Sequence, residues 1–258
     1  MTDKLLVEMR DHTALITINN PAANTWDTEN LSALRDLVNE LNADTNCYSL
    51  VITGQGEKFF SAGADLKLFA SGDKGVAREL ADHFAQAFEA LSNFRGVSIA
   101  AINGYAMGGG LECAIACDIR IAESQAVMAL PEASVGLIPA GLGTQHLSWL
   151  VGEGWAKRMI LCGERVDAAM AEKIGLVEEV VDQGQSLDVA LKLAQKVEKQ
   201  SPKSVSASKI LIQKARSGSM TDAYQKEGDA FVDLFDTLDQ KEGVQAFLEK
   251  RKPVWKNA

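Results

Sequence analysis

Short apolar runs alternate with amphipathic segments along the first half of the chain. The runs 49–53 and 98–103 are almost wholly apolar and each is followed by a glycine, which is typical of buried strands. Apolar residues recur at helical spacing over 26–42 and 76–92. Strands that are apolar on both faces and separated by helices predict an α/β fold with a covered sheet. Further strands are expected at 4–9, 13–19, 118–122 and 126–130, the first two forming a hairpin.

From residue 152 onward the strand pattern nearly vanishes and helical patterns replace it. Two apolar stripes at helical spacing lie in this part, one over 187–197 and one over 231–238. Such stripes are buried within one chain or packed on a neighbouring subunit, and the sequence leaves both possibilities open. We place a boundary near 200–202, which divides a core, 1–200, from a helical C-terminal region, 201–258. Helices are expected at 154–162, 168–174, 186–199, 202–217, 221–238 and 241–250.

Composition argues against several kinds of partner. The 258 residues carry a formal charge of −9, so no nucleic-acid partner and no anionic membrane surface is expected. No run of eighteen apolar residues is present, so no membrane span is expected either. The four cysteines lack a Cys-x-x-Cys spacing and the three histidines lack a ligand spacing, so we predict no metal. Unpaired thiols and the absence of a basic-then-apolar leader predict a cytoplasmic protein.

The candidate chemistry begins at three consecutive glycines, Gly108, Gly109 and Gly110, which precede a predicted helix at 111–117. Glycines allow a ligand to approach the backbone, and a helix start offers unpaired N–H groups with a partial positive charge. A second glycine-bearing turn, 61–64, also comes after a predicted buried strand. Two N–H donors that converge from such turns form an oxyanion hole, which stabilises a developing negative charge.

Two carboxylates accompany these turns. Glu112 follows the glycine triplet, and Glu132 comes after Pro131 twenty positions later. On residue type alone, Glu112 is equally well a helix N-terminal residue favoured by the dipole, and Glu132 an exposed residue that opens a helix. Placed beside an oxyanion hole, the same pair could move protons onto and off an acyl substrate.

Several motifs together identify a resemblance to the enoyl-CoA hydratase/isomerase family, also called crotonases. The match runs in order through nearly the whole chain at the usual spacing. The segments that carry it are Phe60-Ser61-Ala62-Gly63-Ala64-Asp65-Leu66-Lys67, Ala101-Ile102-Asn103-Gly104-Tyr105-Ala106-Met107-Gly108-Gly109-Gly110-Leu111-Glu112, Cys117-Asp118-Ile119-Arg120 and Leu130-Pro131-Glu132-Ala133-Ser134-Val135-Gly136.

The resemblance implies a spiral of ββα units followed by a helical region, 201–258, that builds homotrimers or homohexamers. It implies an acyl-CoA thioester as substrate. By motif position, the oxyanion donors would be the N–H groups of Ala64 and Gly109. The substrate-binding edge would be formed by Ala62, Ala64, Asp65, Leu66, Lys67 and Gly109. No cofactor is expected beyond the coenzyme A of the substrate, because no dinucleotide or phosphate-loop motif is present.

The retained pair of glutamates is typical of the family's hydratases. We expect reversible syn addition of water to a 2-enoyl-CoA, which gives 3-hydroxyacyl-CoA in fatty acid metabolism. Glu112 is the candidate base, and Glu132 the candidate acid for the adjacent carbon. Alternatives are an enoyl-CoA isomerase, a carnitinyl-CoA dehydratase or a non-catalytic CoA-binding scaffold. Trp26 departs from the common family pattern, and we expect it to shape the substrate channel.

Overall fold

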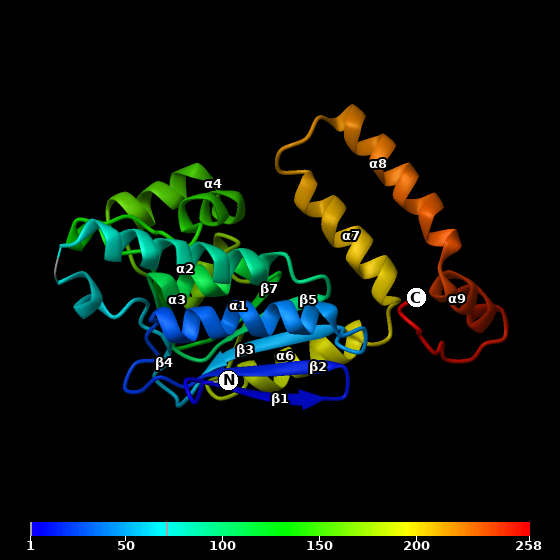
Figure 1. Cartoon of the computed structure of the whole chain (residues 1–258), viewed down its shortest axis with the longest axis horizontal. Helices are drawn as coiled ribbons and strands as arrows, with labels where there is room; N and C mark the ends of the chain where they lie inside the picture. Colours follow the sequence, from blue (N-terminus) through cyan, green and yellow to red (C-terminus); the bar gives the residue numbers. More distant parts are fainter. Residues whose placement is uncertain (1, 71) are drawn as a thin grey trace.

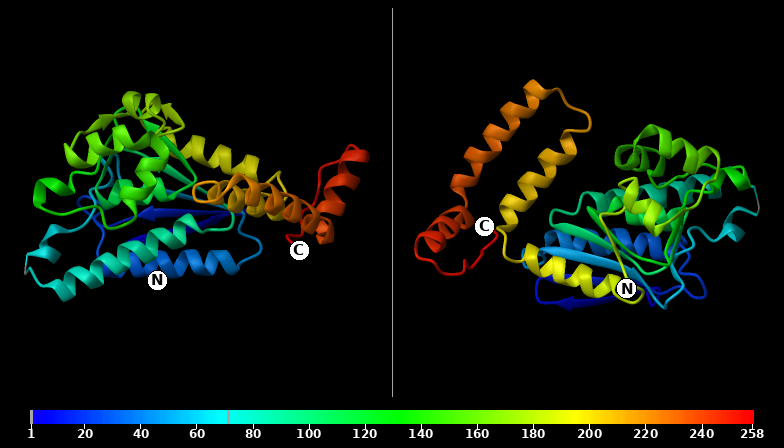
Figure 2. Two further views of the ribbon diagram at one scale, coloured as in Figure 1. Left: turned by 90° about the horizontal axis from the view of Figure 1, so that it is seen from above. Right: turned by 180° about the vertical axis from the view of Figure 1, so that it is seen from behind.

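The computed structural model describes residues 2–70 and 72–258. Its larger sheet lies under a layer of helices (Figures 1 and 2). The first two strands pair antiparallel as a hairpin, and the others pair in parallel. In spatial order they are β1 (Leu5–Arg10), β2 (Thr13–Ile18), β3 (Ser49–Gly54), β5 (Val97–Ile102), β7 (Ile119–Glu123) and β10 (Glu179–Val181).

A second, smaller sheet is built from strands of two or three residues. Its order is β4 (Phe59–Ser61), β6 (Tyr105–Met107), β8 (Val127–Ala129) and β9 (Val166–Asp167). The first three pair in parallel and the last is antiparallel. The chain therefore visits the large sheet, then the small sheet, then a helix, three times in succession. This is the predicted spiral of ββα units, and its helices are α2 (Lys74–Ser92), α3 (Gly109–Ala116) and α4 (Gly143–Leu161).

The large sheet is covered on both faces, as its apolar strands predicted. Leu50 and Ile52 of β3 belong to a core shared with α1 (Thr28–Ala43) and α2. Val51, between them, points to the other face and packs with α6 (Ser186–Val197). Alternate residues of a strand point to opposite faces, so one short apolar run serves two cores.

The C-terminal helices project away from this core (Figures 1 and 2). They are α7 (Pro202–Lys214), α8 (Met220–Asp233), the short helix η3 (Leu234–Asp236) and α9 (Leu238–Leu248). Lys209 ties α7 to the core, because its Nζ donates to the backbone oxygen of Phe94 at 2.6 Å and pairs with Asp118 at 2.7 Å. Large apolar side chains remain exposed on these helices, among them Phe231, Phe235, Phe247 and Leu248.

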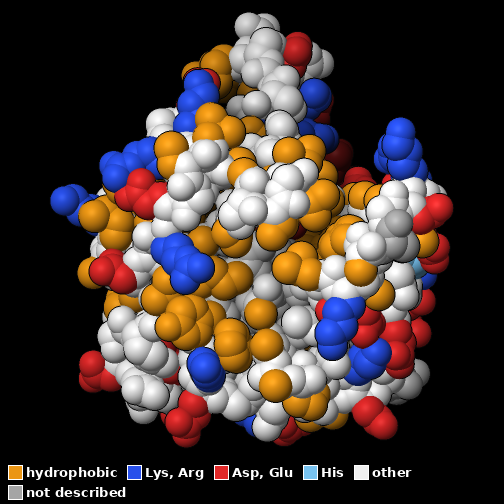
Figure 3. Space-filling view, turned by 90° about the vertical axis from the view of Figure 1, so that its left-hand side faces the viewer, with side chains coloured by type: hydrophobic (Ala, Val, Ile, Leu, Met, Phe, Trp, Pro, Cys, Tyr) orange, Lys and Arg blue, Asp and Glu red, His pale blue; other side chains and the backbone are white. Residues whose placement is uncertain are grey.

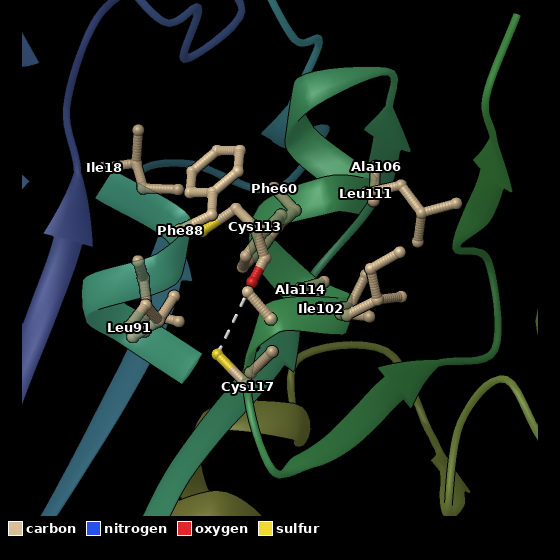
Figure 4. Packing of buried hydrophobic residues seen from close by; sticks show 14 of the residues in the cluster. Ile18, Phe60, Phe88, Leu91, Ile102, Ala106, Leu111, Cys113, Ala114 and Cys117 are labelled. Carbon is tan, nitrogen blue, oxygen red and sulfur yellow. Dashed lines mark hydrogen bonds between the residues drawn. The ribbon is translucent and has the colours of Figure 1, made fainter. Parts of the chain in front are cut away.

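The cysteines of α3 are buried thiols, as their apolar surroundings predicted. Cys113 and Cys117 lie among Phe60, Phe88 and Leu91 in the core (Figure 4). The Cys117 thiol donates to the backbone oxygen of Cys113 at 3.6 Å, and burial raises its pKa to about 12. Such a thiol stays protonated and unreactive.

The sequence interpretation missed several elements. The strands β4, β6, β9 and β10 were not predicted, although β10 completes one edge of the large sheet. These strands have two or three residues, too few to show an alternating pattern, and pairing with distant strands defines them. Helix α4 begins well before the predicted 154–162, and a left-handed Leu142 and a kink at Gly152 obscure its period. Within the described residues, no helix is long and apolar enough to cross a membrane.

Candidate active site

Three segments that the sequence singled out meet at one edge of the small sheet. Residues 62–65 follow β4, residues 108–112 follow β6, and residues 131–132 follow β8. These strands are parallel neighbours, so their carboxyl ends lie side by side and present the following loops together. Segments about 70 residues apart in the chain thereby form one site.

The two glycine-bearing turns are in contact through Gly63. Its φ is +87°, and a Cβ there would lie 2.6 Å from the backbone oxygen of Met107 and 3.0 Å from the backbone nitrogen of Gly109. Only glycine fits both the conformation and the space. The first turn is held further by Ser61, whose hydroxyl accepts the N–H of Gly63 at 3.1 Å.

Two backbone amides at this contact have no partner within the described chain. Ala64 bridges to Trp26, but that bridge uses the oxygen of Gly63 and the N–H of Asp65. The N–H of Ala64 therefore stays free. Gly109 is the first residue of α3, so its N–H has no preceding helical carbonyl to bind. The structure thus brings the two predicted oxyanion donors together and leaves both available.

Glu112 is a buried carboxylate held by backbone donors from a distant loop. Its side chain is 2% exposed, and its Oε1 accepts the N–H groups of Gly141 and Gly143, each at 2.8 Å. Burial and, to a smaller extent, the nearby charge of Glu132 raise the pKa of Glu112 to about 7, against the opposing effect of the backbone donors. A carboxyl group that titrates near neutral pH is suited to proton transfer.

Glu132 opens the short helix η2 (Glu132–Val135) beside the glycine triplet. Its Oε1 lies close to Gly108, because a Cβ on Gly108 would be only 2.9 Å from this oxygen. The φ of Gly108 is +52°. Its Oε2 is buried and has no hydrogen-bond partner among the described residues. Burial raises the pKa of Glu132, because charge on an unpaired carboxylate is poorly solvated.

The amides and both glutamates open into one cavity of about 560 Å³. Of the predicted substrate-binding residues, Ala62, Ala64, Asp65, Leu66 and Gly109 line it. Lys67 is not part of this lining. It lies exposed on η1 (Leu66–Phe69), and its N–H binds the side chain of Asp65.

The expectation that Trp26 shapes the channel is wrong. Its side chain is fully buried, edge-on to Phe88, and the cavity is lined instead by the preceding residue, Thr25. Successive side chains in extended backbone point to opposite sides, so Thr25 faces the cavity and Trp26 faces the core.

The end of the molecule that carries the cavity is rich in apolar side chains (Figure 3). Leu66 on η1 is more than half exposed, and Val135, Leu137 and Ile138 on and after η2 are exposed as well. Helix α2 supplies the inner wall through Leu80 and Phe84. Exposed apolar residues that rim a cavity are typical of a ligand site.

Sequence reasoning missed three residues that build this site. Gly141 and Gly143 donate their N–H groups to Glu112. Phe84 packs against Gly109, where a Cβ would lie only 2.6 Å from the Phe84 ring. The glycine spacing was visible in the sequence. Nothing local indicated which carboxylate, about 30 residues earlier, would accept their N–H groups.

Comparisons with known proteins identify the family of the chain. The sequence profile described as enoyl-CoA hydratase/isomerase matches residues 8–258. The chain belongs to the enoyl-CoA hydratase/isomerase family. It is 36% identical to a short-chain-enoyl-CoA hydratase of Clostridium acetobutylicum, over 97% of this chain and 96% of that one. It is 38% identical to a 2,3-dehydroadipyl-CoA hydratase of Escherichia coli, over 98% of each.

A solved structure of Pseudomonas aeruginosa DspI is also similar to the chain. The two sequences are 65% identical, and the match covers 99% of this chain and 97% of that one. The two structures superpose with a TM-score of 0.96. That structure therefore has the fold described above over nearly the whole chain.

The basic tail at 250–256 lies far from the cavity within one chain. Figure 1 places it beside α9, at the other end of the molecule from η1. Its Arg251 is paired with Glu242 and Glu249, each at 2.6 Å. Among the described residues, no group of three His, Cys, Asp or Glu side chains is placed to hold a metal ion.

Proposed function

We propose that this protein is an enoyl-CoA hydratase, which adds water reversibly and syn across the 2,3 double bond of a 2-enoyl-CoA thioester. The observation that carries the proposal is a pair of carboxyl groups, Glu112 and Glu132, in one cavity with two free backbone amides. The hydratase names of the relatives support it as well.

In this proposal the N–H groups of Ala64 and Gly109 bind the thioester oxygen. They polarise the conjugated system, so that carbon 3 becomes electrophilic, and they stabilise the enolate that forms when water attacks. Because neither amide has a partner in the described chain, no hydrogen bond must break before the substrate binds.

The two glutamates divide the proton transfers according to their surroundings. Two nearby carboxyl groups share one proton and titrate as a coupled pair. Two backbone N–H groups and the start of α3 stabilise charge on Glu112, whereas Glu132 Oε2 has no donor. In the proposed hydration the ionised form of Glu112 accepts the proton of the attacking water, and Glu132 delivers the proton of the pair to carbon 2. In dehydration the roles are reversed.

The test is the loss of enoyl-thioester absorbance when crotonyl-CoA is hydrated. We expect Glu112→Gln and Glu132→Gln each to lower kcat by at least about a hundredfold while the fold remains intact. The matched control is Glu57→Gln, which changes an exposed glutamate outside the cavity. Full turnover in either site variant removes that residue from the mechanism.

The same assay separates the alternatives. An isomerase would gain absorbance with a 3-enoyl-CoA, and a carnitinyl-CoA dehydratase would act on crotonobetainyl-CoA. A scaffold would bind CoA thioesters without turning over any of them. The presence of both glutamates favours a hydratase over an isomerase or a scaffold, and the hydratase names of the relatives favour it over the dehydratase.

We also propose that the protein forms a homotrimer or homohexamer through 201–258 and works in the cytoplasm. The exposed rings of Phe231 and Phe235 support the assembly, because a projecting helical region rarely leaves such rings in water. Light scattering of the wild type and of Phe231→Glu tests it, and a monomeric wild type refutes it. The free thiols of the described cysteines support a reducing compartment.

A further inference from the structure

We propose that the cavity accepts an aliphatic acyl chain without an anionic end, and that Ala77 and Ala81 on α2 set the length that fits. The inference rests on the proposed function, because the amides and glutamates define where the thioester and the reacting carbons lie. It goes beyond that function by naming the substrate class and the residues that select it.

The charges of the cavity wall argue against an anionic chain. Among the described lining residues the ionisable ones are Asp65, Glu112 and Glu132, and no lysine or arginine is present. A chain that ends in a carboxylate would be desolvated without a cation, and the negative charge of the wall would repel it. The rest of the wall is largely aliphatic or aromatic: Leu66, Phe69, Leu80, Phe84, Val135, Leu137 and Ile138.

Helix α2 lines the cavity with a regular stripe. Ala77, Leu80, Ala81 and Phe84 are spaced by three and four residues, so they lie along one face of the helix. Phe84 marks the reacting end of this stripe, because its ring packs against Gly109, one of the two free amides. An acyl chain that starts there and follows the helix passes Ala81 and then Ala77.

The stripe has a length that a linear chain can be measured against. The helix rises about 1.5 Å per residue, so Ala81 lies roughly 5 Å and Ala77 roughly 10 Å from Phe84 along the axis. The second value is comparable with an extended alkyl chain of medium length. Alanine carries only a Cβ, so at these two positions the wall leaves room that a larger residue would fill. Ala81 is half-buried and Ala77 is exposed at the rim, which places the two at successive depths.

The experiment measures kcat/KM for trans-2-enoyl-CoA thioesters of four, six, eight, ten and twelve carbons. Each added methylene that is buried should raise kcat/KM by about fourfold until the chain passes the stripe. In Ala81→Leu, the ratio of the ten-carbon to the four-carbon value should fall at least about tenfold, because the new side chain occupies the path of the longer chain. In Ala77→Leu, the fall in kcat/KM should be smaller and should begin at a longer acyl chain.

Ala85→Leu is the matched control. It makes the same replacement on the same helix at a half-buried alanine that does not line the cavity, so the chain-length ratio should stay at the wild-type value. An equal change of the ratio in this variant would assign the effect to helix packing and overturn the proposal. A preference for 2,3-dehydroadipyl-CoA over the uncharged thioester of equal length would overturn it as well, because the acyl chain of that thioester ends in a carboxylate.

Calorimetric binding of saturated acyl-CoA thioesters separates this inference from the proposed hydration. The affinity should rise with acyl-chain length as kcat/KM does, and Ala81→Leu should shorten the longest chain that still gains affinity. Both effects are expected even if no thioester is hydrated. If crotonyl-CoA is hydrated but the length series is flat in both wild type and Ala81→Leu, the hydratase stands and the chain-length inference fails.

Discussion

Removing the ionisable group at residue 112 should change how stability depends on pH. The folded-state pKa of Glu112 is about 7, against an ordinary value of 4.5. Between these values the folded protein binds more protons than the unfolded chain, so the free energy of unfolding falls as pH rises through this window. A difference of about 2.5 pKa units corresponds to roughly 3 kcal/mol.

Glu112→Gln removes this titration and keeps the local contacts. The amide oxygen of glutamine can accept the N–H groups of Gly141 and Gly143 as the carboxylate does. Relative to wild type, the variant should therefore gain roughly 2 to 3 kcal/mol of unfolding free energy between about pH 5 and about pH 8. All other titrating groups contribute equally to both proteins, apart from Glu132, whose charge is coupled to that of Glu112.

The assay is denaturant unfolding of both proteins at these two pH values, at one fixed protein concentration so that any assembly contributes equally. Glu57→Gln, which changes an exposed glutamate outside the cavity, should follow the wild-type curve. Glu132→Gln should weaken the pH dependence, because the pKa of Glu112 falls when the neighbouring charge is removed. If the free energy of unfolding changes with pH in the same way for wild type and Glu112→Gln, burial does not raise the pKa of this carboxylate.

Three further predictions concern the contact between the two glycine-bearing turns, the glutamate pair and the buried Arg120. Gly63→Ala should lower kcat by more than about a hundredfold, because its Cβ would push on the backbone of Gly109. Gly56→Ala, at a similar positive φ in open space, should cost only about 1 kcal/mol of stability and leave kcat at the wild-type value. Between about pH 6 and about pH 9, kcat/KM of wild type should fall as the glutamate pair loses its shared proton, and a flat profile would contradict the acid role of Glu132. Arg120→Met should destabilise the fold by about 3 kcal/mol in thermal unfolding, because it leaves backbone acceptors and Glu178 without their buried partner, and a shift within error would show that those groups find water instead.

The sequence by itself determined the elements whose patterns are long enough to read. The apolar runs of β3 and β5 and the helical periods of α1 and α2 each span a full strand or several turns, and the structure has them within two residues of the expected ends. The glycines at 63 and 108–110 likewise carry their meaning locally, because a positive φ or a close backbone approach admits few other residues.

Tertiary structure decided what depends on contacts between distant parts of the chain. The strands β4 and β6 are too short to be recognised alone, yet their parallel pairing is what brings Ala64 and Gly109 to one edge. The pKa of Glu112 is raised by burial and by the charge of Glu132, and donors in a loop about 30 residues away limit the rise; a local pattern encodes none of these. Local residue types fix what a segment can do, whereas desolvation and non-local hydrogen bonds fix which of those possibilities the folded protein uses.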